Sequence, residues 1–213
     1  MFTSKPSALR KVRRPPILFA EWFVVLNGCV PLVMLMYDAR YRQLGADPIR
    51  NALQVTGAMS LFLLIATLSI TPLQRISGFR DLVKSRRPLG LMSFLYASAH
   101  VLIYVGYDRV WDWADALSEL SQRRYLQAGA LAFLIMIPLA ITSSPNMMRL
   151  LGSRQWKRLH KCVYVAAIAG AIHFWMQSKA NFYLQVGSFI AVGILLMTRV
   201  ANRWEPRRST RIT

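Results

Sequence analysis

Three histidines, His100, His160 and His173, are the side chains of this sequence best suited to chemistry. Each lies in or at the edge of a long apolar block, and none lies in the long polar stretches between blocks. An ionisable side chain inside a membrane is costly and by default functional. Because imidazole is a common metal ligand and can also carry protons, the histidines predict a metal or proton site.

The apolar blocks that carry these histidines are each about twenty residues long, enough to cross a bilayer as helices. The chain has 213 residues, 54% of them hydrophobic, and a mean hydropathy of +0.32. We therefore expect an all-α membrane protein whose transmembrane domain, residues 17–199, lies between basic tails at 1–16 and 200–213. The six expected helices span about 17–37, 52–71, 88–107, 125–142, 158–177 and 182–199. We expect the second to end at Thr71-Pro72, because proline cannot continue a helix without losing a hydrogen bond.

The positive charges predict the orientation. Residues 1–16, 75–87, 149–161 and 199–211 hold five Lys or Arg each, whereas the remaining seven lie in the other three connections. Cytoplasmic loops are enriched in Lys and Arg, so both termini should be cytoplasmic. The same clustering argues against nucleic-acid binding, which the net charge of +18 would otherwise suggest.

This orientation assigns a depth to each histidine. His100 lies roughly 18 Å along the helix at 88–107, and His173 lies at the same level on the helix at 158–177. His160 lies near the cytoplasmic face. Two imidazoles at one depth can clamp one iron, with a porphyrin between the two helices. Without a C-x-x-C-H motif the heme would be held noncovalently, so we expect heme b between these helices.

His160 is harder to assign. Thirteen residues rotate a straight helix by about 220°, so His160 and His173 do not share one face of an unbroken helix. A second bis-histidine heme would need a fourth histidine, and the sequence has three. The ligand opposite His160 and the number of hemes stay open.

Four further side chains are candidates for contacts with a cofactor. Arg86, at the inner level of the helix that carries His100, and its neighbour Arg87 cannot ligate iron but can pair with heme propionates or a flavin phosphate. They can equally be positive-inside anchors of the membrane domain. Tyr96 and Tyr104 are spaced to pack on a porphyrin ring or to bond its propionates.

These residues resemble a known family. The motifs, in order, are Thr71-Pro72-Leu73, Arg86-Arg87 followed by Leu89-Gly90-Leu91, His100, Trp156-x-x-Leu159-His160-x-x-x-Tyr164, and His173-Phe174. They are similar to those of the heme-binding membrane subunits of bacterial methionine-sulfoxide reductase systems, the MsrQ (formerly YedZ) family of ferric-reductase-like transmembrane domains. The resemblance covers nearly the whole chain beyond the N-terminal tail. The chain departs from the family pattern at Arg124, where proline is expected, and at Phe174, which removes a hydroxyl beside His173.

The resemblance implies a multi-pass cytochrome b of the bacterial inner membrane, associated with heme b and FMN. It would take electrons from the quinone pool or a cytosolic flavin reductase. It would pass them to a periplasmic molybdenum-cofactor enzyme that reduces methionine sulfoxide in oxidised envelope proteins. The family's histidine positions carry over as His100, His160 and His173.

The residues themselves favour an electron-transfer subunit over a catalytic one. The sequence has no G-x-G-x-x-G nucleotide-binding motif and no evident catalytic constellation. One alternative is a small stand-alone ferric or oxygen reductase. Another is a non-redox transporter or scaffold whose histidines bind protons or a metal, which would be colourless.

Overall fold

The computed structural model describes residues 18–177 and 182–204, and all regular secondary structure in those residues is helical. The longer helices are α1 (Leu18–Arg40), α2 (Pro48–Ser77), α3 (Arg86–Ile103), α5 (Arg124–Ile141), α6 (Pro145–His160), α7 (Val163–Gln177) and α8 (Phe182–Trp204). Shorter pieces are η1 (Arg80–Ser85), the π-helical η2 (Tyr104–Asp108) and α4 (Trp113–Gln122). The predicted tail at 1–16, and the other predicted tail beyond Trp204, lie outside the described residues.

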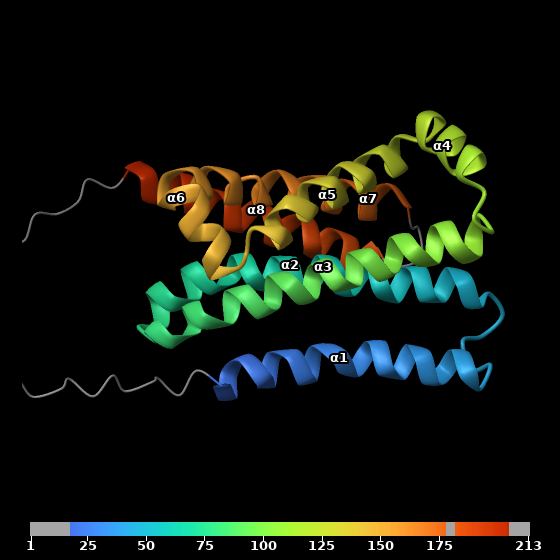
Figure 1. Ribbon diagram of the computed structural model, residues 1–213, viewed down its shortest axis with the longest axis horizontal. Helices are drawn as coiled ribbons and strands as arrows, with labels where there is room; N and C mark the ends of the chain where they lie inside the picture. Colours follow the sequence, from blue (N-terminus) through green and yellow to red (C-terminus); the bar gives the residue numbers. More distant parts are fainter. Residues whose placement is uncertain (1–17, 178–181, 205–213) are drawn as a thin grey trace, which may run out of the picture.

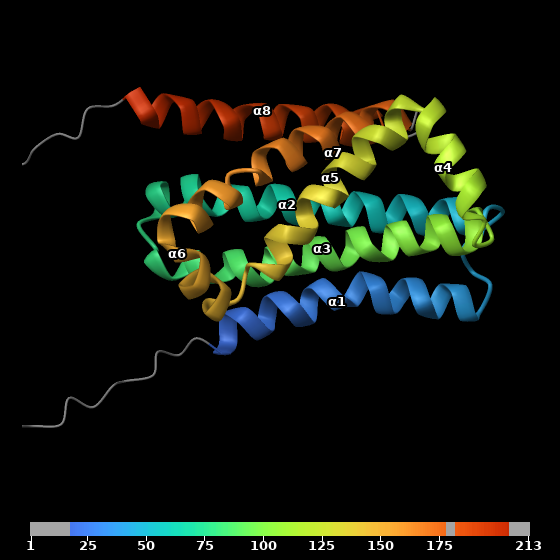
Figure 2. The ribbon, with the colours of Figure 1, turned by 45° about the horizontal axis from the view of Figure 1, so that its top comes forward.

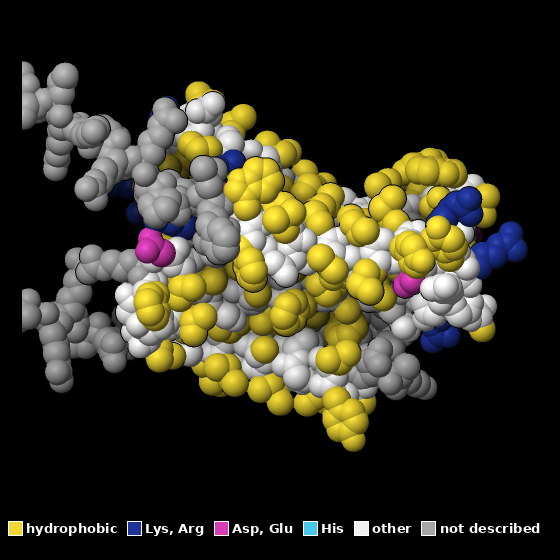
Figure 3. All heavy atoms as spheres, turned by 90° about the horizontal axis from the view of Figure 1, so that it is seen from below, with side chains coloured by type: hydrophobic (Ala, Val, Ile, Leu, Met, Phe, Trp, Pro, Cys, Tyr) yellow, Lys and Arg dark blue, Asp and Glu magenta, His cyan; other side chains and the backbone are white. Residues whose placement is uncertain are grey.

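Within the described residues, six helical segments are long and apolar enough to cross a membrane, which confirms the prediction of a multi-pass helical membrane protein. They are Glu21–Arg40, Pro48–Ser77, Asp81–Asp108, Arg124–Ile141, Pro145–Gln177 and Phe182–Ala201. Hydrophobic side chains cover the middle of the face in Figure 3, and charged side chains gather toward its two ends. Large apolar side chains such as Phe62 and Leu134 are more than half exposed. An apolar surface this broad suits contact with lipid.

The bundle is built from two tightly packed helix pairs, α2 with α3 and α5 with α7. Helix α8 packs against both α7 and α2, and α1 lies along the α3 side of the bundle (Figures 1 and 2). The main core joins Leu64 and Leu68 of α2 to Met136 of α5 and to buried alanines of α7. Small residues let membrane helices approach closely, and Ala166 and Ala167 of α7 are fully buried.

The connections lie at two opposite ends of the bundle. The beginning of α1, the end of α8, η1 and α6 lie at one end, on the left of Figures 1 and 2, whereas α4 lies at the other. The two described connections in which the sequence concentrates Lys and Arg, 75–87 and 149–161, therefore share one end. His100 and His173 lie in the halves of α3 and α7 that are nearer the α4 end.

The prediction that the second helix ends at Thr71-Pro72 is wrong. Helix α2 continues through Pro72 to Ser77, and it ends where Gly78 adopts a left-handed conformation (φ 74°) and donates its N–H to the Gln74 carbonyl. Proline removes one hydrogen bond from the helix, but membrane helices tolerate that loss because neighbouring helices and local adjustment satisfy the freed groups. The glycine C-cap is the true end signal.

The segment expected as one helix over 158–177 is divided. Helix α6 ends at His160, and α7 begins at Val163. Across the junction the N–H groups of Lys161 and Cys162 bond carbonyls three residues back, at Arg158 and Leu159, so the backbone tightens there. The rotation of about 220° expected for an unbroken helix therefore does not apply. Two predicted connections also contain the helices α4 and α6.

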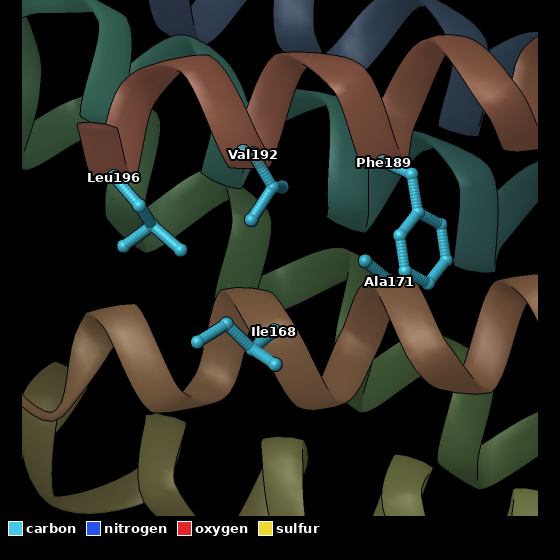
Figure 4. Close-up of a pocket in the computed structure, with 6 residues that line it drawn as sticks. Ile168, Ala171, Phe189, Val192 and Leu196 are labelled. Atoms are coloured by element: carbon cyan, nitrogen blue, oxygen red, sulfur yellow. The ribbon is translucent and has the colours of Figure 1, made fainter. Parts of the chain in front are cut away.

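An apolar groove lies between α7 and α8 (Figure 4). Its lining residues are Ile168, Ala171, Phe189, Val192, Gly193 and Leu196. This lining includes no histidine and no charged side chain, so the groove offers nothing to ligate a metal. The candidate chemistry lies on other faces of these helices.

Candidate functional site

His100 of α3 and His173 of α7 face each other inside the bundle. Their ring centroids are 6.0 Å apart, and the ring planes are nearly perpendicular, at 85°. Seventy-three positions separate the two residues in the sequence, so the packing of the helix pairs brings them together. The expectation that they share one level of the bundle agrees with this geometry.

Each of the two histidines is held by a main-chain carbonyl of the neighbouring helix. Nδ1 of His100 lies 3.0 Å from the Leu53 carbonyl oxygen of α2, and Nδ1 of His173 lies 2.7 Å from the Tyr125 carbonyl oxygen of α5. A carbonyl can only accept a hydrogen bond, so Nδ1 must carry the proton in both rings. Nε2 then keeps its lone pair, which is the state that a metal requires of histidine.

The spacing of the two rings fits one metal ion between them. A bond from imidazole nitrogen to a transition metal is about 2 Å long, so two such bonds span about 4 Å. The remainder of the 6.0 Å between centroids is about what the two ring radii require. The described residues hold no group of three or more His, Cys, Asp or Glu side chains that could bind a metal, so a two-histidine clamp is the arrangement they offer.

His160 lies in a different setting, at the end of α6. Its ring stacks on Trp156 with centroids 3.9 Å apart, and its Nδ1 lies 3.2 Å from the Trp156 carbonyl oxygen one turn earlier. The indole of Trp156 donates in turn to the Thr142 carbonyl, at 2.8 Å, after the end of α5. This stacking fixes the orientation of His160 without a contact to the His100 and His173 pair.

Two arginines converge on one threonine at the α6 end of the bundle. Nη2 of Arg86 donates to the Thr71 hydroxyl at 2.6 Å, and Arg199 of α8 donates to the same oxygen. The Arg199 guanidinium also lies over the Tyr164 ring, 5.5 Å from its centroid. Among the described residues neither arginine has a carboxylate partner. Nε of Arg86 is buried without a hydrogen bond.

An uncompensated pair of guanidinium groups is suited to an anion. Like charges so close repel each other, and phosphate or carboxylate groups can accept from both. Arg86, predicted as a cofactor contact, therefore lies in a cationic cluster with Thr71, Tyr164 and Arg199. Arg87, predicted beside it, is exposed to the surroundings and makes no contact with this cluster in the described structure.

The hydroxyls of two tyrosines that were candidates for propionate contacts bond protein groups instead. Tyr96 is fully buried, and its hydroxyl donates at 2.6 Å to the Gly28 carbonyl of α1. Tyr104 donates at 2.7 Å to a carboxylate oxygen of Glu119 in α4. Both hydroxyls join α3 or η2 to neighbouring helices, and packing of either ring on a porphyrin stays a prediction.

The end of the bundle near the histidine pair carries a network of charges. Arg109 forms ion pairs with Asp108, Asp115 and Glu119, at 2.9 to 3.0 Å. The hydrogen bond to Asp115, followed by the other acidic neighbours, raises the pKa of the Arg109 guanidinium above its ordinary value. Glu119 also pairs with Arg123 at 2.7 Å. Most of these acidic side chains are paired with an arginine of the protein itself. This pairing favours a solvated cluster of charges over an acidic surface left open for a partner.

Sequence reasoning missed several groups that build these sites. Arg199 counted only as one of the five cations near the C-terminal end of the sequence, and nothing in the sequence indicated that α8 brings it to Thr71. The carbonyls of Leu53 and Tyr125 have no signature in side-chain types. Gly129 was the one usable signal. A glycine in the interior of a helix destabilises that helix relative to alanine, so its presence there calls for a structural explanation.

The six-span bundle with its facing histidines is of the ferric-reductase-like class. Residues 55–171 match the family described as ferric reductase like transmembrane component. That match covers a little over half of the chain and includes His100 and His160.

Comparison with curated proteins gives a narrower assignment. A protein-methionine-sulfoxide reductase heme-binding subunit MsrQ from Ralstonia nicotianae is 38% identical over 205 residues, covering 95% of this chain and 91% of that protein. Proteins with the same description from Herminiimonas arsenicoxydans and Rhodospirillum rubrum are 38% and 35% identical, covering 91% and 88% of this chain and 89% and 90% of theirs. The chain belongs to the MsrQ family.

Proposed function

We propose that this protein is the heme-binding, electron-transferring membrane subunit of a protein-methionine-sulfoxide reductase system. The observation that carries the proposal is the facing pair His100 and His173, with ring centroids 6.0 Å apart and both Nδ1 atoms at main-chain carbonyls. The relatives are described as heme-binding subunits of that reductase. A bound heme b would supply one-electron chemistry at this site.

In this proposal the protein's own residues provide binding, orientation and charge. His100 and His173 present Nε2 lone pairs to the metal, and the Leu53 and Tyr125 carbonyls keep the rings in one tautomer. Hydrogen bonds of this kind orient a ligating histidine and raise its basicity. Both rings are half-buried between the packed pairs α2–α3 and α5–α7.

The proposed direction of electron flow follows from charge. The connections rich in Lys and Arg share one end of the bundle (Figure 1), and such connections face the cytoplasm. Both termini are then cytoplasmic in a bacterial inner membrane, and the histidine pair lies toward the periplasmic side. Electrons would enter from the quinone pool or a cytosolic flavin reductase. They would leave to a periplasmic molybdenum-cofactor catalytic subunit, which reduces the methionine sulfoxide.

The cationic cluster is the proposed site of a second cofactor. Arg86 and Arg199 offer donors for the phosphate of FMN, and the unpartnered Nε of Arg86 is available to the same anion. His160 and its stacking partner Trp156 would belong to this inner side. His160 would then act in the transfer of electrons toward the heme, as a metal ligand or beside the flavin.

The test is the absorption spectrum of the purified protein in detergent, oxidised and dithionite-reduced, with quantification of pyridine hemochrome. Reduced α-bands of low-spin b-type heme are expected in the wild type, and they should be lost in His100→Ala and in His173→Ala. A wild-type complement of heme in either variant would refute the assignment of ligands. A colourless wild-type protein that does not take up added heme would refute the electron-transfer function.

A further inference from the structure

Two glycines lie directly against the two facing histidines. A Cβ atom added at Gly57 of α2 would lie 3.1 Å from both Cε1 and Nδ1 of His100. A Cβ added at Gly129 of α5 would lie 2.8 Å from Nδ1 and 2.9 Å from Cε1 of His173. Contacts under 3.0 Å cannot be accommodated unless a neighbour moves, so an alanine at 129 would displace the imidazole.

The two contacts repeat one local geometry. The carbonyl that holds His100 belongs to Leu53, four residues before Gly57, and the carbonyl that holds His173 belongs to Tyr125, four residues before Gly129. In an α-helix the carbonyl of residue i accepts from the N–H of residue i+4, which here is the glycine. A carbonyl oxygen has two lone pairs, so the histidine takes the second. It reaches that oxygen only where the residue at i+4 has no Cβ in the way.

Other glycines in the helices that carry the histidines lack such contacts. A Cβ at Gly90 of α3 would meet Thr67 at 3.8 Å, and one at Gly170 of α7 would meet Leu61 at 3.6 Å, both ordinary packing distances. Gly28 of α1 is also closely approached, at 3.0 Å, but by the far end of the flexible Met92 side chain, which can move aside. The distinguishing feature of Gly57 and Gly129 is that their close neighbour is an imidazole ring held by a hydrogen bond.

We propose that Gly57 and Gly129 are paired positioning residues of the histidine clamp. Each exposes the carbonyl four residues before it to one histidine, so both rings are fixed as the Nδ1–H tautomer with Nε2 left for the metal. This inference rests on the proposed heme site for its functional meaning, but the contacts themselves join groups of the polypeptide.

The first test compares heme binding in alanine variants. Gly57→Ala and Gly129→Ala are expected to lower heme affinity by about 10- to 100-fold, the usual effect of losing a hydrogen bond behind a metal ligand. The loss should be larger at 129, where the contact is shorter. The electron paramagnetic resonance g-values of any heme that remains should shift, since they report ligand orientation. Gly90→Ala and Gly170→Ala are the matched controls and should leave both measurements unchanged. Wild-type affinity and g-values in both test variants would overturn the proposal.

The second test separates positioning from helix packing, and it uses heme-free protein. Gly129→Ala should lower the melting temperature in the presence of His173, but not in the His173→Ala background, where the ring is gone. The double variant should therefore fold even if Gly129→Ala alone does not. An equal cost in both backgrounds, or a double variant that does not fold while His173→Ala does, would show that α5 needs glycine for packing and would overturn the proposal.

The same heme-free protein reports the tautomer directly. The 15N NMR spectrum of protein labelled at histidine should show protonated Nδ1 and unprotonated Nε2 for both His100 and His173. Protonated Nε2 in either ring would contradict the positioning role. If His100→Ala retained its heme, the proposed function would fail, and the melting-temperature comparison would still decide the glycine contacts.

Discussion

Replacement of Arg199 by glutamine tests whether the cationic cluster is a binding site or a structural tie. Arg86 and Arg199 donate to the same Thr71 oxygen, so their charged nitrogens can be no more than about 5–6 Å apart. At an effective dielectric constant of about 20, two like charges at that distance repel by about 3 kcal/mol. This cost is relieved when Arg199 is replaced.

The same replacement removes two favourable contacts of Arg199. A hydrogen bond from a charged group contributes about 1.5–3 kcal/mol, and the cation–π contact with Tyr164 contributes about 0.5–1 kcal/mol. These losses nearly offset the relieved repulsion. The free energy of unfolding of the ligand-free Arg199→Gln protein should therefore change by no more than about 1 kcal/mol in either direction.

Binding of an anion should respond quite differently. Loss of one charge-assisted hydrogen bond to a phosphate, about 1.5–3 kcal/mol, weakens binding by about 10- to 100-fold. We therefore expect Arg199→Gln and Arg86→Gln each to reduce the affinity for FMN by that factor, measured by flavin fluorescence titration in detergent. Arg87→Gln is the matched control, because Arg87 is adjacent but exposed, and it should bind FMN like the wild type.

Two results would refute this reasoning. Unchanged FMN affinity in both Arg86→Gln and Arg199→Gln would show that the cluster does not hold the flavin phosphate. A loss of several kcal/mol of stability in ligand-free Arg199→Gln would show that the arginine acts as a structural tie, with its charge already compensated.

Three further variants test the remaining assignments. His160→Ala should keep the heme of the His100 and His173 site but slow its reduction by the donor, followed by stopped-flow absorption; loss of all heme would instead make His160 a ligand of that heme. Tyr96→Phe should lower the free energy of unfolding by about 1 kcal/mol, because it removes one buried hydrogen bond to α1, and thermal melting with an unchanged midpoint would contradict that bond. Glu119→Gln should weaken the attachment of α4 to η2 by about 1–3 kcal/mol, which limited proteolysis would detect as faster cleavage within α4. Equal cleavage rates in the variant and the wild type would show that the ion pairs of Arg109 contribute little to this attachment.

The sequence determined the parts of the fold that depend on the chemistry of the solvent. Six apolar blocks, each long enough to cross a bilayer, predicted six spans, because backbone polar groups in lipid must be satisfied within helices. The clustering of Lys and Arg predicted which connections share one end. The three histidines were recognisable as candidates because an imidazole within an apolar block is costly.

Local boundaries were less predictable. The continuation of α2 through Pro72 and the break between His160 and Val163 depend on how neighbouring helices compensate altered backbone hydrogen bonds. Such compensation comes from tertiary contacts, which have no signature at a single position. For that reason the depth of His100 could be estimated by counting residues, whereas the relation of His160 to His173 could not.

The sequence by itself thus determined that histidines at one depth of a membrane bundle could meet. Only the tertiary structure decided which groups complete the two sites. It brought the Leu53 and Tyr125 carbonyls to the imidazoles beside Gly57 and Gly129, and it put Arg199, not Arg87, beside Arg86 at Thr71. The physical reason is that a main-chain carbonyl and a distant arginine act through position alone, and position is set by the packing of α2 on α3 and of α5 on α7.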